Sequence, residues 1–322
     1  MATKSIRNMI GVAYAVLSIW AADTKGTAQN PSAPKVEAPY EMHLSVDEVS
    51  ILFHATDAHG LAISDLKAEE LDLLDEEKGP GRILALQPLS DRPLSVGFLI
   101  DVSGSVARYV GQSRTWAAQV AQTLISRPGD TGLVVTFGRS RRVVQPWSDQ
   151  QKSVMAAIGQ VTPGPNGPTE GTGIFDALFA TCHYEFGGSK RDGRQHVLLL
   201  FSDGEDTASH MSQKDAVEEC NQAHTAVYAI APWPVPGTSS TGPITLRDLT
   251  ERTGGRILRE EEPDAEKKAD IERLSNDLRQ EYELFYRPKD LKHDGAFHRI
   301  VLVGPKRVAS IDAQSGYYAP AR

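Results

Sequence analysis

Three oxygen-bearing side chains stand at alternate positions in the segment Asp101-Val102-Ser103-Gly104-Ser105. They follow residues 94–100 (LSVGFLI), an apolar run typical of a strand buried on both faces of a parallel sheet. In open α/β sheets, ligands bind beyond the carboxyl ends of the strands, which is where this carboxylate and these hydroxyls would lie. Oxygen ligands without nitrogen or sulfur favour a hard cation such as Mg²⁺ over Zn²⁺.

This Asp-x-Ser-x-Ser spacing resembles the metal-ion-dependent adhesion site of von Willebrand factor A (VWA) domains. The family pattern adds a threonine well downstream and an aspartate at the end of a later buried strand. Residues 171–178 (GTGIFDAL) are similar to the threonine segment, and residues 197–206 (VLLLFSDGED) are similar to the strand with its aspartate. The resemblance therefore nominates Thr172 and Asp203 as the two remaining site residues. Thr169 is the alternative threonine, and Thr172 is favoured because it precedes Asp176 by four residues, as in the family.

The resemblance implies a metal site with an open position. Ser103, Ser105 and Thr172 would ligate Mg²⁺, or Mn²⁺ or Ca²⁺, through hydroxyls, while Asp101 and Asp203 would ligate it directly or through water. Three neutral donors leave the ion short of negative charge. In the family, a Glu or Asp carboxylate from a partner protein often supplies the missing anionic oxygen. We therefore expect a non-enzymatic protein that mediates metal-dependent adhesion or protein–protein interaction.

Two other interpretations remain open on the sequence alone. Aspartates and serines are also favoured as helix caps and turn residues, so the segment could belong to a structural envelope protein in which a metal only stabilises the loop. A metal-assisted hydrolase would use the ion as a Lewis acid and would need a general base close by. His210, seven residues after Asp203, is the nearest histidine that could serve.

The start of the chain has the layout of a secretory signal peptide over residues 1–28. Lys4 and Arg7 precede the apolar stretch 9–22, which is short for a membrane span, and Gly26-Thr27-Ala28 offers small residues for cleavage. We expect a secreted or periplasmic, cell-envelope protein, and an uncleaved anchor would be its sole link to a membrane. Removing three basic residues and one acidic residue with this segment changes the net charge from −8 to −10, which argues against nucleic-acid binding.

The chain has two cysteines, Cys182 and Cys220, and each lies in an expected helix beside the strand at 197–202. An oxidising compartment permits a disulfide between them. Sequence does not set the separation of the two Cα atoms, so the pairing stays open here.

Strands and helices alternate over residues 93–260, the expected VWA domain. This alternation predicts an α/β fold with a doubly wound, mostly parallel sheet and helices on both faces, similar to VWA and Rossmann-like domains. One of these helices is expected to have Thr245 as its N-cap and to stop at Gly254-Gly255.

The flanks differ from this central region. Residues 29–41 predict a linker, 42–92 and 282–322 are strand-like, and 261–281 predict a charged helix with Ile271, Leu274 and Leu278 on one face. Because two short strand sets are not stable separately, we expect the two β segments to form one small β domain. The segments 56–60 (TDAHG) and 315–318 (SGYY) extend the resemblance to a VWA-related family common in acidobacteria, over nearly the whole mature chain.

Overall fold

The computed structural model describes residues 48–79, 82–164, 171–187, 192–231, 241–259, 264–290 and 292–319. The predicted signal peptide, the predicted linker and Thr169 lie outside these residues.

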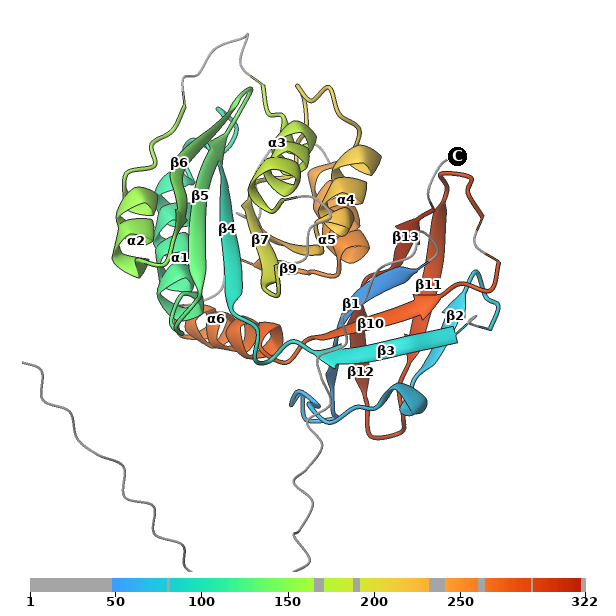
Figure 1. Ribbon diagram of the computed structural model, residues 1–322. Coiled ribbons are helices and arrows are strands. Elements are labelled where there is room, and N and C mark those ends of the chain that lie inside the picture. The colour runs from blue at the N-terminus through green and yellow to red at the C-terminus, as the bar shows by residue number, and fades with distance from the viewer. Residues whose placement is uncertain are drawn as a thin grey trace, which may run out of the picture. The chain divides into compact units, whose positions relative to one another are not determined.

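A six-stranded sheet forms the centre of the α/β region (Figure 1). Its strand order is β6-β5-β4-β7-β8-β9, and every neighbouring pair is parallel except β5 with β6. The strands are β4 (Leu94–Asp101), β5 (Thr131–Phe137), β6 (Arg141–Ser148), β7 (Gln195–Phe201), β8 (Thr225–Ala231) and β9 (Ile257–Arg259). The predicted doubly wound, mostly parallel α/β fold is confirmed.

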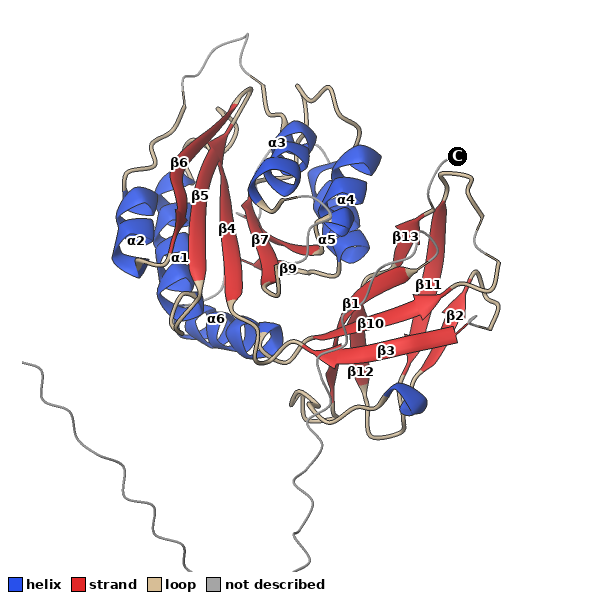
Figure 2. Cartoon of the chain, in the orientation of Figure 1, coloured by secondary structure: helices blue, strands red, loops and turns tan. Residues whose placement is uncertain are grey.

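Helices cover both faces of this sheet (Figure 2). One face carries α1 (Val110–Leu124), α2 (Gln151–Gly159) and α6 (Asp264–Leu278), and the other carries α3 (Ile174–Ala180), α4 (Gln213–Gln222) and α5 (Thr241–Thr253). Side chains alternate along a strand, so β4 contributes Phe98 to the first core and Leu99 to the second. This double burial explains why β4 is apolar almost throughout.

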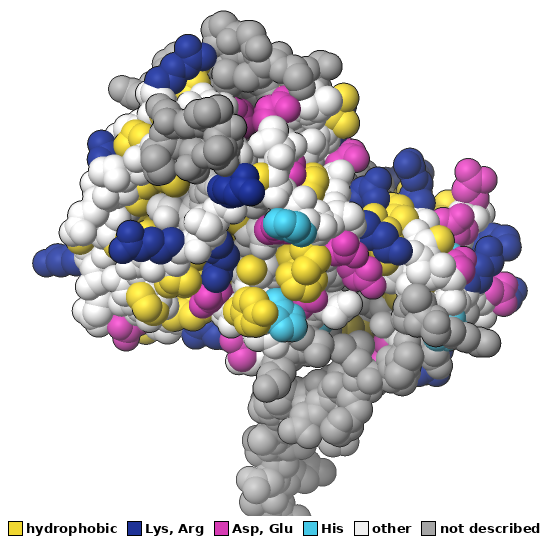
Figure 3. Space-filling model, turned by 90° about the horizontal axis from the view of Figure 1, so that it is seen from above, with side chains coloured by type: hydrophobic (Ala, Val, Ile, Leu, Met, Phe, Trp, Pro, Cys, Tyr) yellow, Lys and Arg dark blue, Asp and Glu magenta, His cyan; other side chains and the backbone are white. Residues whose placement is uncertain are grey.

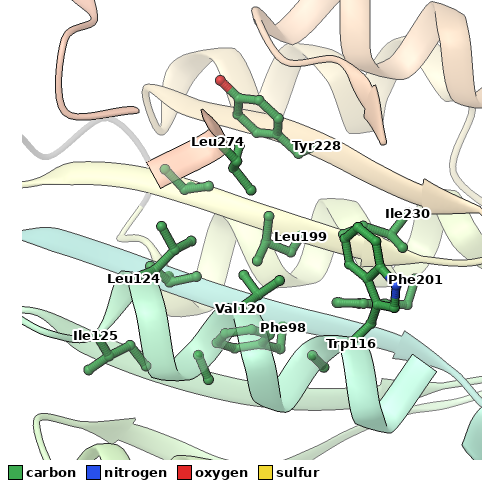
Figure 4. Packing of buried hydrophobic residues seen from close by; sticks show 14 of the residues in the cluster. Phe98, Trp116, Val120, Leu124, Ile125, Leu199, Phe201, Tyr228, Ile230 and Leu274 are labelled. Carbon is green, nitrogen blue, oxygen red and sulfur yellow. The ribbon is translucent and has the colours of Figure 1, made fainter. Parts of the chain in front are cut away.

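The first core is built around α1. Trp116, Val120 and Leu124 of this helix lie against Phe98 and Leu199 of the sheet (Figure 4). All five side chains are almost fully buried. Such a close-packed centre holds β4 and β7 rigidly side by side, and both strands lead into the site described below.

Helix α6 belongs to the same core. The sequence predicted a helix over 261–281, set apart from the α/β region, whereas α6 spans Asp264–Leu278. Its three apolar positions, Ile271, Leu274 and Leu278, are buried together with α1 and the sheet. The helix therefore completes the α/β domain instead of connecting it to the next segment.

Helix α5 also begins earlier than the sequence indicated. Thr241 is its first residue, and the predicted N-cap Thr245 lies inside it. The Thr245 hydroxyl donates a hydrogen bond to the Thr241 carbonyl (3.1 Å), which is an ordinary contact for a threonine inside a helix.

The flanks of the chain pair with each other, as predicted. A four-stranded antiparallel sheet has the order β12-β1-β10-β3, and a three-stranded one has the order β13-β11-β2. The strands are β1 (Val49–Thr56), β2 (Asp72–Asp75), β3 (Arg82–Pro88), β10 (Tyr282–Arg287), β11 (Phe297–Val303), β12 (Ser310–Ala313) and β13 (Gly316–Tyr318), and a 3₁₀ turn spans Ala68–Glu70.

Strand β1 is shared between two cores. Ile51 and Phe53 pack in the core of the β region, whereas Leu52 belongs to the core around α1. His54 lies 3.5 Å from Asp277 of α6, measured from Nε2 to Oδ1, and Asp277 also pairs with Arg256. Strand β1 thus contacts the α/β domain through apolar Leu52 and the imidazole of His54, and β13 adds a hydrogen bond from Arg252 to the Tyr318 hydroxyl (2.7 Å).

A buried carboxyl group lies where α6 leads into β10. Tyr228 donates its hydroxyl hydrogen to Glu281 Oε1 (2.7 Å), and the Gln195 side-chain amide donates to Oε2 (2.7 Å). Burial raises the pKa of Glu281 from its ordinary value of 4.5 to about 7, although these two hydrogen bonds oppose the rise. The carboxyl therefore holds a proton at pH values where an exposed glutamate has lost it.

We predict that Glu281 makes the chain less stable as the pH rises from about 4.5 to 7. Over this range the folded chain keeps a proton that the unfolded chain has released, so the free energy of unfolding falls, by about 3 kcal/mol at most. Glu281→Gln should remove this slope and be more stable than wild type at pH 8. The new amide can keep its oxygen toward Gln195 Nε2, which also donates to the Leu278 carbonyl (2.8 Å), and donate its own N–H to the Tyr228 hydroxyl oxygen.

Urea unfolding of both proteins between pH 4 and 9 checks this prediction. Parallel pH profiles for Glu281→Gln and wild type would contradict it.

A disulfide joins the helices on the second face. Cys182 lies in a π-helical turn, η2 (Thr181–Glu185), which continues α3, and its partner Cys220 lies on α4. Both residues are buried. The bridge ties α3 to α4 across a sequence separation of 38 residues.

Replacing both cysteines, as in Cys182→Ala/Cys220→Ala, should lower the free energy of unfolding by about 4 kcal/mol, because opening a 38-residue loop releases entropy in the unfolded chain. Urea unfolding at pH 7 measures the difference. An unchanged midpoint would show that the bridge adds no stability.

Candidate metal centre

The two aspartates of the predicted site lie at neighbouring strand ends. Asp101 is the last residue of β4, and Asp203 follows the end of β7 by two residues. The two strands are parallel neighbours, with Ile100 paired to Phe201. Both aspartates are 2% exposed. Two carboxylates are thus buried next to each other at the carboxyl edge of the sheet.

The serine loop folds around Asp101. The Ser103 backbone N–H donates to Asp101 Oδ1 (2.9 Å), and the hydroxyl oxygens of Ser103 and Ser105 lie 3.3 Å apart. Ser103 is buried, whereas Gly104 and Ser105 are exposed. The hydroxyls therefore lie between the buried carboxylate and the surface.

Ser202 links the two strand ends, and the sequence motif did not include it. Its hydroxyl donates to Asp101 Oδ2 (2.8 Å) and accepts from the Gly204 backbone N–H (3.1 Å). Gly204 has φ +83°, and a Cβ at this position would lie 2.3 Å from the Gly242 carbonyl oxygen. Glycine is therefore required here, which explains the Asp-Gly pair after β7.

The electrostatics of the pair favour a bound cation. Burial raises the pKa of Asp101 to about 6, against hydrogen bonds from Ser103 and Ser202. Burial also raises the pKa of Asp203, although the Glu205 backbone and the Ser105 hydroxyl donate to it. Within the described part of the chain, Asp203 Oδ2 is a buried oxygen without a hydrogen-bond partner. A positive ion would stabilise the ionised form of both groups.

The threonine segment adjoins this pair. The Thr172 backbone N–H donates to Thr207 Oγ1 (3.0 Å), and its carbonyl accepts from the backbones of Thr207 (2.9 Å) and Ala208 (3.0 Å). On the other side, a Cβ added to Gly138 would lie 3.8 Å from both the Gly171 carbonyl oxygen and Ser103 Cα. The structure therefore brings Asp101, Ser103, Ser105, Thr172 and Asp203 into one region.

The donor set is poor in negative charge. Among the described residues, no group of three or more His, Cys, Asp or Glu side chains is arranged to hold a metal ion. Two carboxylates and three hydroxyls fit a hard cation that keeps water or takes a further anionic oxygen. These residues suit Mg²⁺ better than a thiol- or imidazole-binding metal.

Glu205 and His210 follow Asp203 in the sequence, and each interacts with a residue outside the predicted metal site. Glu205 accepts hydrogen bonds from the Thr241 hydroxyl (2.9 Å) and the Gly242 backbone (3.0 Å) at the start of α5. His210, the general base of the hydrolase interpretation, lies 3.1 Å from Asp176, and its side chain is 91% exposed. Seen from above, this face carries acidic, basic, histidine and hydrophobic side chains next to one another (Figure 3).

We predict that Asp101→Asn stabilises the metal-free protein. At pH 7.5 Asp101 is ionised and buried, so removing its charge should raise the free energy of unfolding by about 1–3 kcal/mol. Ser202 can accept a hydrogen bond from the new amide. Urea unfolding in EDTA measures the change, and the exposed Asp149→Asn is the matched control. A destabilised Asp101→Asn would show that burial does not disfavour this charge.

A family model, the von Willebrand factor type A domain, matches residues 95–269. No curated protein matches the chain. None of the described helices has the length and apolar character needed to cross a bilayer.

Several solved structures are similar to part of the chain. BatB from Bacteroides thetaiotaomicron has 15% identity and a TM-score of 0.43, over 56% of this chain and 97% of its own. An aerotolerance-related membrane protein from Bacteroides fragilis has 12% identity and a TM-score of 0.45, over 57% and 98%. Proximal thread matrix protein 1 from the mussel byssus, with a zinc-occupied metal-ion-dependent adhesion site, has 18% identity and a TM-score of 0.48, over 64% and 49%.

Proposed function

The chain belongs to the von Willebrand factor type A domain family, and on that premise we propose that it is an exported, non-enzymatic protein that binds a partner protein through a divalent cation. The observation that carries this proposal is the buried pair of Asp101 and Asp203. Both have raised pKa values, and Asp203 Oδ2 lacks a hydrogen-bond partner among the described residues.

The cation would be Mg²⁺, or Mn²⁺ or Ca²⁺. Ser103, Ser105 and Thr172 would hold it through hydroxyl oxygens, and Asp101 and Asp203 would do so directly or through water. The ion supplies a Lewis-acidic position for one more anionic oxygen. Exposed Gly104 and Ser105 leave this position accessible to a carboxylate of the partner.

Interaction is favoured over hydrolysis by the surroundings of the site. His210 shares its Nδ1 with Asp176 and points its exposed side chain to solvent. Export is supported by the signal-peptide pattern at the start of the sequence and by the Cys182–Cys220 disulfide, since disulfides persist in oxidising compartments.

Metal-dependent capture tests this function. The immobilised full chain is exposed to an envelope extract in Mg²⁺ or in EDTA, beside Asp101→Ala and the exposed control Asp149→Ala. We expect one partner to be retained by wild type and Asp149→Ala in Mg²⁺, and to be lost with EDTA or Asp101→Ala. Replacing the partner's contacting Glu or Asp by its amide should also abolish binding. A partner that is still retained in EDTA and by Asp101→Ala would overturn the proposal.

A further inference from the structure

Two carboxylates join the loop after Asp203 to the segment after Thr172. Each lies on one segment and accepts hydrogen bonds from backbone N–H groups of the other. Asp206, on the loop, accepts hydrogen bonds at Oδ2 from the backbone N–H groups of Ile174 (2.8 Å) and Phe175 (3.2 Å). Asp176, on α3, accepts at Oδ1 from the backbones of His210 (2.9 Å) and Met211 (2.7 Å). Each segment therefore satisfies backbone donors of the other.

Asp206 is itself held in place from its own side of this contact. Ser209 donates its hydroxyl hydrogen to Asp206 Oδ2 (2.6 Å) and its backbone N–H to Oδ1 (3.2 Å). The same serine oxygen accepts from the Asp176 backbone (3.1 Å). Four donors thus orient one carboxylate, which makes it a rigid support for the first turn of α3.

Thr172 lies two residues before the backbone that Asp206 holds. Its own N–H and carbonyl are bonded to Thr207 and Ala208, which directly follow Asp206. Residues 206–208 therefore hold Thr172 and the first turn of α3, while the neighbouring Gly173 donates its backbone N–H to the Gly138 carbonyl (2.8 Å). A small displacement of this contact would move the threonine away from the aspartate that shares its ion.

We propose that Asp206 is a positioning residue that sets the affinity for the cation by holding Thr172 against the Asp203 loop. The inference rests on the proposed function, because it takes Thr172 and Asp203 as ligands of one ion. Groups that orient metal ligands without touching the metal typically contribute about 10- to 100-fold in affinity.

Asp215 offers a matched control. It is also an aspartate that accepts hydrogen bonds at a helix start, from the Ser212 backbone (3.0 Å) and hydroxyl (2.7 Å) at α4. Its hydrogen bonds stay within one capping box and do not involve the threonine segment. Asp215→Ala therefore reports the loss of an ordinary cap, and Asp206→Ala reports the loss of the contact between segments.

Calorimetric titration of Mg²⁺ into the metal-free full chain tests the proposal, with circular dichroism to confirm that each variant is folded. We expect Asp206→Ala to bind Mg²⁺ at least about tenfold more weakly than wild type and Asp215→Ala to bind it normally. Asp206→Asn keeps an oxygen for Ile174 and Phe175 and should restore most of the affinity. In a Thr172→Ala background, Asp206→Ala should have no further effect, because it acts through the threonine.

Three results would overturn the inference while leaving the proposed function intact: wild-type affinity in Asp206→Ala, an equal loss in Asp215→Ala, or a full additional loss in the Thr172→Ala background. An absence of Mg²⁺ binding by wild type would instead refute the proposed function itself.

Discussion

The site depends on the burial of two like charges at the ends of adjacent parallel strands. The pairing of β4 with β7 places Asp101 beside the Asp203 loop, and both aspartates are almost fully buried. Among the described residues, neither carboxylate has an arginine or lysine as a hydrogen-bond donor; hydroxyls and backbone N–H groups serve instead. The fold thus creates a place where a cation is the simplest means of balancing charge.

The surrounding elements keep this arrangement fixed. The loop after β7 supplies Asp203 and then two further acids, of which Glu205 bonds to the start of α5 and Asp206 to the start of α3. The disulfide joins the far end of the α3 segment to α4. At the opposite end of β7, its first residue Gln195 bonds to Glu281, and the β region also contacts the start of α4, where Lys214 donates to the Gly295 carbonyl.

Much of the fold could be predicted from the sequence, because the patterns that indicate each strand and helix lie within short segments. The apolar run before Asp101 and the alternation of strands and helices predicted the sheet, and the flanking strand patterns predicted the paired β segments. The contacts between segments that are distant in the sequence could not be predicted from it. Ser202 and Asp206 look like ordinary loop residues in sequence. The role of Ser202 arises where the ends of β4 and β7 meet, and that of Asp206 where the loop after β7 meets α3. Helix α6 carries a charged pattern that resembles a connector, and its buried face becomes significant only against α1.

The central claim is that Asp101 and its neighbours hold a divalent cation, and thermal unfolding of the full chain over a range of Mg²⁺ concentrations, against EDTA, tests it most directly. A ligand that binds only the folded state raises stability by RT ln(1 + [L]/Kd). The account predicts that the midpoint of wild type climbs with Mg²⁺ concentration and that the midpoint of Asp101→Ala does not respond. A wild-type midpoint that is indifferent to Mg²⁺, or an equal rise in Asp101→Ala, would contradict it.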